Sequence, residues 1–170
     1  IQRARALADR YWLDLLEMDP LLGTEAGDER FDDRLGDPSE AGLARHELAH
    51  RSALDELATI DRTALPASDR GTMDVLEAIA HRGLAELEMV EGKLDAAAET
   101  IEKGLAVAPN DIDLHLVAGE IEVRRGKLAD AEARIAKLKE LKPTSPSDKA
   151  RLFLLIGRWH EANTRLDDAL

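Results

Sequence analysis

The sequence of 170 residues contains no cysteine, and aromatic residues make up only 3% of it. Without cysteine the chain forms no disulfide and carries no thiolate chemistry, which fits a cytoplasmic location without excluding export. So few aromatic residues, beside many alanines and leucines, favour close packing of helices over β-sheets. No apolar run approaches the length that spans a membrane, and no signal peptide is visible. These absences predict an all-α protein.

Charge is plentiful but unbalanced, with a net charge of -12. An acidic chain repels phosphate backbones and anionic lipid surfaces, so we expect neither a nucleic acid nor a membrane as a partner. The charge is also distributed unevenly along the sequence. Residues 1–80 carry 9 Arg, no Lys and 18 Asp or Glu, whereas residues 81–170 carry 14 Lys or Arg and 17 Asp or Glu. This shift predicts two segments of different character that join near residues 80–92.

The most regular feature of the chain is a unit that occurs twice, with a period of 34 residues. In each copy a Gly-Lys-Leu sequence predicts a tight turn between two helices, and a proline predicts the end of the second helix. The matched positions are Gly92 and Gly126, Ala97 and Ala131, Ile101 and Ile135, and Pro109 and Pro143. We therefore expect one helical hairpin in residues 78–111 and another in residues 112–145. The four expected helices span residues 79–91, 94–107, 112–125 and 128–141.

The period and the placement of small residues resemble those of the tetratricopeptide repeat (TPR) family. The resemblance implies an all-α fold in which helical hairpins stack as a short right-handed solenoid, preceded here by an N-terminal helical segment. The chain departs from the family where large aromatic residues are usual, because His81 and His115 stand at one such position and Glu88 and Glu122 at another. A partial third copy covers residues 150–170. In this copy Gly157, Leu166 and Ala169 match Gly119, Leu128 and Ala131, so Leu166 is expected to begin its second helix.

In this family the first helix of each hairpin lines a concave groove, which suits an extended peptide or a helix. The resemblance therefore implies a protein–protein interaction module or scaffold that needs no cofactor. The groove lacks the Asn and Lys residues with which some related domains clamp a terminal carboxylate, so we do not expect that ligand. Because the third copy is incomplete, its apolar surface is also a candidate for self-association. The expected groove residues are Arg82, Glu86, Met89, Val90, Leu116, Glu120, Val123, Arg124, Arg151, Leu154 and Arg158.

Residues 1–77 contain no repeat, but their apolar residues recur at helical spacing. Ser39 has the side chain of an N-cap residue and predicts the start of a helix. We expect the last helix of this segment to continue unbroken into the first repeat. The expected helices span residues 2–18, 39–60 and 68–91.

A charged loop, residues 27–37, links the first two of these helices. We expect it to be ordered, because Phe31 and Leu35 can be buried. The sequence around Phe31, together with Asp19-Pro20 before it, resembles the N-terminal part of a bacterial family of large α-helical zinc metallopeptidases. The resemblance covers residues 1–85, and the family's zinc-binding helix lies far downstream of this region. It therefore implies shared ancestry without activity.

Within the second expected helix, residues 46–50 match the pattern H-E-x-x-H. On a helix this pattern places the imidazoles of His46 and His50 one turn apart, with Glu47 able to activate a zinc-bound water. Zinc would also need a third protein ligand and an open cleft, and Glu77 is only a formal candidate for that ligand. We therefore interpret the match as a structural helix whose two histidines flank its apolar contact. The residues expected to be buried are Leu43, Leu54 and Leu57.

Three functions stay open on the sequence alone. The leading interpretation is an interaction module that binds a peptide or helix of another protein. The second is a fragment or accessory part of a zinc-dependent peptidase, in which His46 and His50 are ligands and Glu47 is the base. The third is a fusion of two segments, residues 1–77 and 78–170, that share no function.

Overall fold

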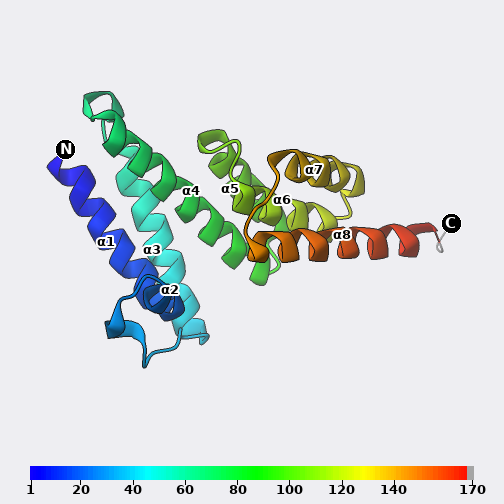
Figure 1. Ribbon diagram of the computed structural model, residues 1–170, viewed down its shortest axis with the longest axis horizontal. Coiled ribbons are helices and arrows are strands. Elements are labelled where there is room, and N and C mark those ends of the chain that lie inside the picture. The colour runs from blue at the N-terminus through cyan, green and yellow to red at the C-terminus, as the bar shows by residue number, and fades with distance from the viewer. Residues whose placement is uncertain (168–170) are drawn as a thin grey trace. The chain divides into compact units, whose positions relative to one another are not determined.

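The computed structural model describes residues 1–167, and these residues form helices and connecting turns without a β-strand (Figure 1). The described part of the chain has eight α-helices, which pack as consecutive antiparallel pairs, so the expected all-α class is confirmed. Its contacts divide the chain into a first unit, Ile1–Gly83, and a second unit that begins at Leu84. The α-helices are α1 (Gln2–Met18), α2 (Pro20–Glu25), α3 (Glu40–Ala58), α4 (Ala67–Val90), α5 (Leu94–Val107), α6 (Ile112–Arg124), α7 (Leu128–Leu141) and α8 (Pro146–Asp167).

The first unit is built on an apolar cluster to which α1, α3 and α4 contribute. Ala4, Leu7 and Tyr11 lie on one side of α1, because residues three or four positions apart share a helix face. α3 begins as expected at its N-cap Ser39, whose Oγ accepts a hydrogen bond from the backbone N–H of Gly42 at 3.1 Å. α4 is the single long helix expected to continue into the first repeat. The other buried residues of the cluster are Ala53, Leu57, Leu65, Met73, Leu76 and Ala80.

The charged loop between α2 and α3 is held by one aromatic side chain. Phe31 is buried against α2, where a Cβ at Gly23 would lie 2.8 Å from atoms of the Phe31 side chain. The guanidinium groups of Arg30 and Arg34 lie 5.6 and 5.2 Å from the centre of the Phe31 ring. The expectation that Leu35 is also buried is wrong, because this residue is 83% exposed. Of the two residues expected to anchor the loop, only Phe31 is buried.

The hairpins of the second unit turn in the same way at both predicted glycines. Gly92 has φ +76° and Gly126 has φ +71°, a region that side-chain-bearing residues rarely adopt. After each glycine, the N–H of Lys93 or Lys127 donates back to a carbonyl five residues earlier, at 2.8 Å in both hairpins. This pattern is the Schellman C-cap. The two turns and the four expected helices are therefore confirmed.

The partial third copy differs from its prediction. Leu166 was matched to the start of a second helix, but α8 runs without a break from Pro146 to Asp167, so Leu166 lies inside it. The position that corresponds to the turn glycine Gly126 is Thr164, which lacks glycine's access to positive φ, and the helix continues through it. The matched residue Ala169 lies outside the described residues.

α8 packs onto α6 and α7 through the core of the second unit. α6 and α8 approach each other closely at Gly119, where a Cβ would lie 2.6 Å from Cδ2 of Leu155. The buried residues of this cluster are Leu116, Ile135, Leu138 and Leu155. Within residues 1–167, no helix is long and apolar enough to cross a membrane.

Candidate functional site

Most of the groove residues expected on α6 and α8 lie together around a small pocket. The pocket has a volume of about 100 Å³. We call this surface the α6/α8 face and define it by the pocket-lining residues Leu116, Glu120, Arg151, Leu154, Leu155 and Arg158. Leu155, which the sequence analysis did not include, forms its buried floor because it packs into the core cluster. Leu154, its neighbour, is 62% exposed.

Ion pairs cross the α6/α8 face and fix its charged side chains. Glu120 accepts a hydrogen bond from Arg124 at 2.7 Å and also pairs with Arg158. Arg151 pairs with Asp113, which lies in the first turn of α6 and was missed by the sequence analysis. All five side chains keep part of their surface in solvent. Exposed pairs of this kind contribute little to stability, so they remain available to a ligand.

The remaining expected groove residues do not all belong to this surface. Leu116 is buried, and Val123 packs against the same core cluster, so both support the face from below. On α4, Arg82 falls within the first unit. The other α4 residues fall within the second unit, where Glu86 and Met89 are half-buried and Val90 is exposed. The residues expected to form one groove are thus divided between the two units.

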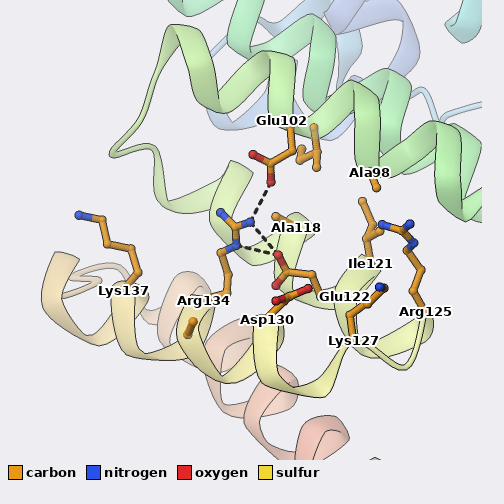
Figure 2. A pocket seen from close by; sticks show the side chains of 12 residues that line it. Ala98, Glu102, Ala118, Ile121, Glu122, Arg125, Lys127, Asp130, Arg134 and Lys137 are labelled. Carbon is orange, nitrogen blue, oxygen red and sulfur yellow. Dashed lines mark hydrogen bonds and ion pairs between the residues drawn. The ribbon is translucent and has the colours of Figure 1, made fainter.

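A larger cleft lies among α5, α6 and α7, and sequence reasoning missed it (Figure 2). Its volume is about 440 Å³. α5 and α6 contribute the apolar residues Ile101, Ala118 and Ile121. The charged residues are Asp130, Arg134 and Lys137 of α7 and its N-cap residue Lys127. We call it the Arg134 cleft, because the guanidinium of Arg134 reaches across it to carboxylates on both other helices.

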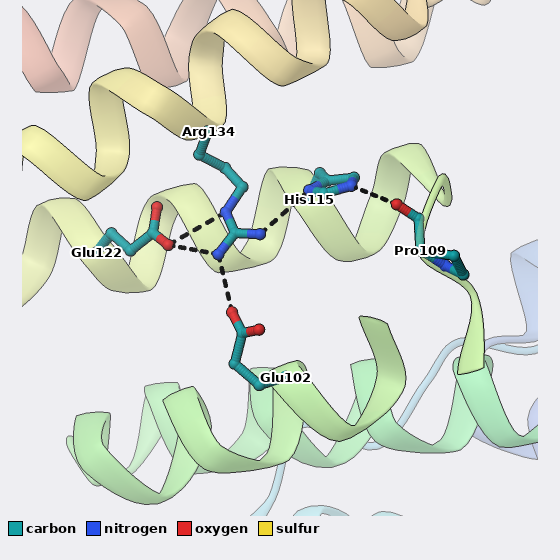
Figure 3. Close-up of polar contacts among 5 residues, drawn as sticks. All are labelled: Glu102, Pro109, His115, Glu122 and Arg134. Atoms are coloured by element: carbon teal, nitrogen blue, oxygen red, sulfur yellow. Dashed lines mark hydrogen bonds and ion pairs between the residues drawn. The ribbon is translucent and has the colours of Figure 1, made fainter. Parts of the chain in front are cut away.

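Arg134 is the centre of a polar network that includes His115 and Glu122, two residues at positions where the TPR pattern has large aromatic residues (Figure 3). Its Nε and Nη2 donate to Glu122 at 3.1 and 2.7 Å, and Nη2 also donates to Glu102 of α5 at 2.8 Å. Its Nη1 lies 3.3 Å from Nδ1 of His115, whose Nε2 lies 2.9 Å from the carbonyl oxygen of Pro109. Since Arg134 can only donate and the carbonyl can only accept, His115 carries its proton on Nε2.

Burial sets the electrostatics of this network. Burial raises the pKa of the Glu122 carboxyl, and the hydrogen bonds from Arg134 only partly offset this effect. Burial likewise opposes the charge of Arg134, but the hydrogen bond and charge of Glu122 hold its pKa above the usual value. The signal that could have revealed Arg134 was Glu122, an acidic residue at a position where packing was expected, because a carboxylate removed from water needs a cation.

The H-E-x-x-H residues do not form a metal site. His50 is buried, 6% exposed, and its Nδ1 shares a hydrogen bond of 2.7 Å with the hydroxyl of Tyr11. Its Nε2 faces α4, where a Cβ at Gly83 would lie only 2.3 Å away. Glu47 instead pairs with Arg51 along α3, and Glu77 pairs with Arg62. Among the described residues, no group of three or more His, Asp and Glu side chains is placed to hold a metal ion.

The expected burial of α3 is therefore only partly correct. Leu57 is buried, while Leu43 and Leu54 are half-buried. His46 is half-buried at the edge of the contact, as expected, but His50 lies inside it. Burial, followed by the charges of His46 and Arg82, lowers the pKa of His50 to about 4. His50 is therefore neutral near pH 7 and serves as a core residue.

Comparison with known proteins adds no family to these observations. The sequence matches neither a protein-family model nor a curated protein. The resemblances of the two segments to the TPR family and to the metallopeptidase family therefore rest on the residues and spacings quoted above.

Proposed function

We propose that α4–α8 are TPR-type hairpins and that the chain is a protein interaction module, which binds an extended peptide or a helix of another protein on the α6/α8 face. The equal turns at Gly92 and Gly126 support a repeated hairpin, and the hairpins of this family stack as a right-handed solenoid. Exposed Leu154 beside the pocket carries the functional proposal, because a large apolar side chain at the mouth of a polar-rimmed pocket marks a contact site.

The α6/α8 face can accept one apolar side chain of a bound peptide, with the charged residues around the pocket contacting the peptide's polar groups. A peptide side chain can enter the pocket between Leu116 and Leu154, where it would be desolvated on its apolar surface. Around the pocket, Arg151 and Arg158 present guanidinium groups that can donate to the carbonyls or carboxylates of a bound segment. Their present partners, Asp113 and Glu120, are exposed enough for the pairs to exchange at low cost.

The proposal is tested by selecting peptides from a displayed random library on the purified full chain and measuring their affinities. Leu154→Ser should weaken the selected peptides at least tenfold, since burying one leucine side chain is worth about 1.5–3 kcal/mol. Leu48→Ser is the matched control, because Leu48 is a similarly exposed leucine on α3, which belongs to the first unit. Peptides that bind Leu154→Ser as tightly as the unmodified chain would place the binding site elsewhere and overturn the proposal.

A further inference from the structure

The solvent side of α8 carries a row of four exposed residues spaced four positions apart: Lys149, Phe153, Gly157 and Glu161. The opposite side of the helix packs through Leu155 into the core of the second unit. Phe153 is 72% exposed and is the most exposed aromatic side chain among the described residues. Rows of residues four apart form ridges along which helices pack on one another, so this row has the form of a helix-packing surface.

Gly157 is the residue of the row that calls for an explanation. It lies inside a helix of 22 residues, where glycine costs about 1 kcal/mol relative to alanine. Its counterpart in the preceding hairpin, Gly119, is required by the close approach of Leu155. A Cβ at Gly157 would have nothing within 4 Å, so no contact within the described residues requires a glycine there. A close approach from outside the chain would require one.

We propose that this row is a self-association surface, on which α8 of one copy packs antiparallel on α8 of a second copy. In the register centred between Phe153 and Gly157, the ring of Phe153 lies over Gly157 of the second copy. The same register sets Lys149 opposite Glu161 of the second copy. A two-fold axis makes each of these contacts occur twice, which is the property of an isologous interface.

The order of the four residues selects a second copy as the occupant. In an antiparallel pair, Lys149 of each copy faces Glu161 of the other, and Phe153 of each copy faces Gly157 of the other. Opposite charges therefore meet, and the large ring meets the residue without a side chain. A parallel pairing would set Lys149 against Lys149 and Glu161 against Glu161, which repel. The row is therefore complementary to itself in the antiparallel sense. It is only about 18 Å long at 1.5 Å per residue, so the interface is small and the dimer weak.

The association is measured by sedimentation equilibrium on the full chain from roughly 1 to 200 micromolar, which brackets the affinity of a small interface. The unmodified chain should shift from monomer to dimer within this range. Lys149→Glu or Glu161→Lys alone should weaken the dimer about tenfold, because two attractive pairs become two repulsive ones. The double variant Lys149→Glu/Glu161→Lys should restore it. Lys139→Glu is the control, since Lys139 is an exposed lysine on α7 outside the row.

A second variant separates loss of the interface from loss of the fold. Gly157→Leu should abolish the dimer, because its side chain fills the space that Phe153 of the second copy would enter. The same change should leave the helical circular dichroism equal or stronger, since leucine favours a helix more than glycine does. A chain that stays monomeric up to the highest concentration would overturn the proposal. So would a dimer that survives Gly157→Leu, or a double charge variant that does not recover.

Discussion

Both units of the molecule bury a histidine against a neighbouring helix, and they satisfy it with opposite kinds of partner. In the first unit, His50 shares a hydrogen bond with the phenol of Tyr11, and both groups are neutral. In the second unit, His115 meets the charged guanidinium of Arg134, which in turn pairs with Glu122, a side chain that is only 13% exposed. Protonation of His50 should destabilise the first unit, because it creates a buried charge. Removal of Arg134 should destabilise the second unit, because it leaves a carboxylate without its cation.

The comparison can be measured because each unit has its own tryptophan. Trp12 lies in α1 of the first unit, and Trp159 lies in α8 of the second unit, where its Nε1 donates to the carbonyl oxygen of Leu128 at 2.9 Å. The chain has no other tryptophan. Replacing either one by phenylalanine therefore leaves a fluorescence signal from a single unit.

The largest expected effect is the loss of the cation in the second unit. Arg134→Met should destabilise this unit by about 3 kcal/mol, because it leaves the Glu122 carboxylate buried without its partner. Urea unfolding followed by Trp159 in a Trp12→Phe background measures the change.

The matched control for this prediction removes the stranded charge. In Arg134→Met/Glu122→Gln, roughly half of the loss should return, since a neutral amide is less costly to bury than a carboxylate. If Arg134→Met unfolds at the same urea concentration as the unmodified chain, the network does not hold the second unit together.

The contrast between the two histidines was only partly visible in the sequence. The turns at Gly92 and Gly126 and the cap at Ser39 could be predicted, because each depends on residues within one helical turn. The role of Arg134 could not, since its partners lie on two other helices and are brought to it only by packing. For the same reason, the H-E-x-x-H pattern could not reveal that Tyr11 and Gly83 enclose His50.

The candidate surfaces also differ in how far the sequence could reveal them. Glu120, Arg151, Leu154 and Arg158, which were named from the 34-residue period, line one pocket, because residues at fixed spacings on neighbouring helices face the same side. The Arg134 cleft has no such pattern, since its lining combines residues of three helices. The length of α8 was also misjudged, because it depends on the absence of a turn residue at Thr164.

The second prediction concerns how the stability of each unit changes as the pH falls. The pKa of His50 is near its ordinary value of 6.5 in the unfolded chain and about 4 in the folded one. Between these pH values the unfolded chain binds more protons, so the stability contributed by neutral His50 is complete above pH 6.5 and is lost as the pH falls towards 4. The loss in the first unit should be on the order of 3 kcal/mol.

In the second unit, Glu122 should contribute to the pH dependence with the opposite sign. The pKa of Glu122 is raised in the folded state, so its protonation with falling pH favours folding of that unit. Urea unfolding at several pH values, followed by Trp12 and by Trp159 separately, measures both trends. His50→Gln should flatten the dependence of the first unit between pH 4 and 6.5. His46→Gln should reduce it only in part, because His46 helps to lower the pKa of His50 and has a lowered pKa of its own. Equal slopes in the unmodified chain and in His50→Gln would assign the acid sensitivity to other groups.

The smallest expected effect concerns the exposed arm of the charged network. Glu102 also accepts a hydrogen bond from Arg134, but its side chain is 59% exposed, compared with 13% for Glu122. Because an exposed carboxylate is hydrated whether or not it is paired, the pair contributes little. Glu102→Gln should therefore destabilise the second unit by less than about 1 kcal/mol. Salt screens such a pair, so this small difference should shrink further when urea unfolding is followed through Trp159 in about 0.5 M sodium chloride. A loss as large as that of Arg134→Met would mean that the network depends on its exposed carboxylate. The second unit would then depend on the ion pair that joins α5 to α7 through Glu102 and Arg134, and not on the partly buried carboxylate of Glu122.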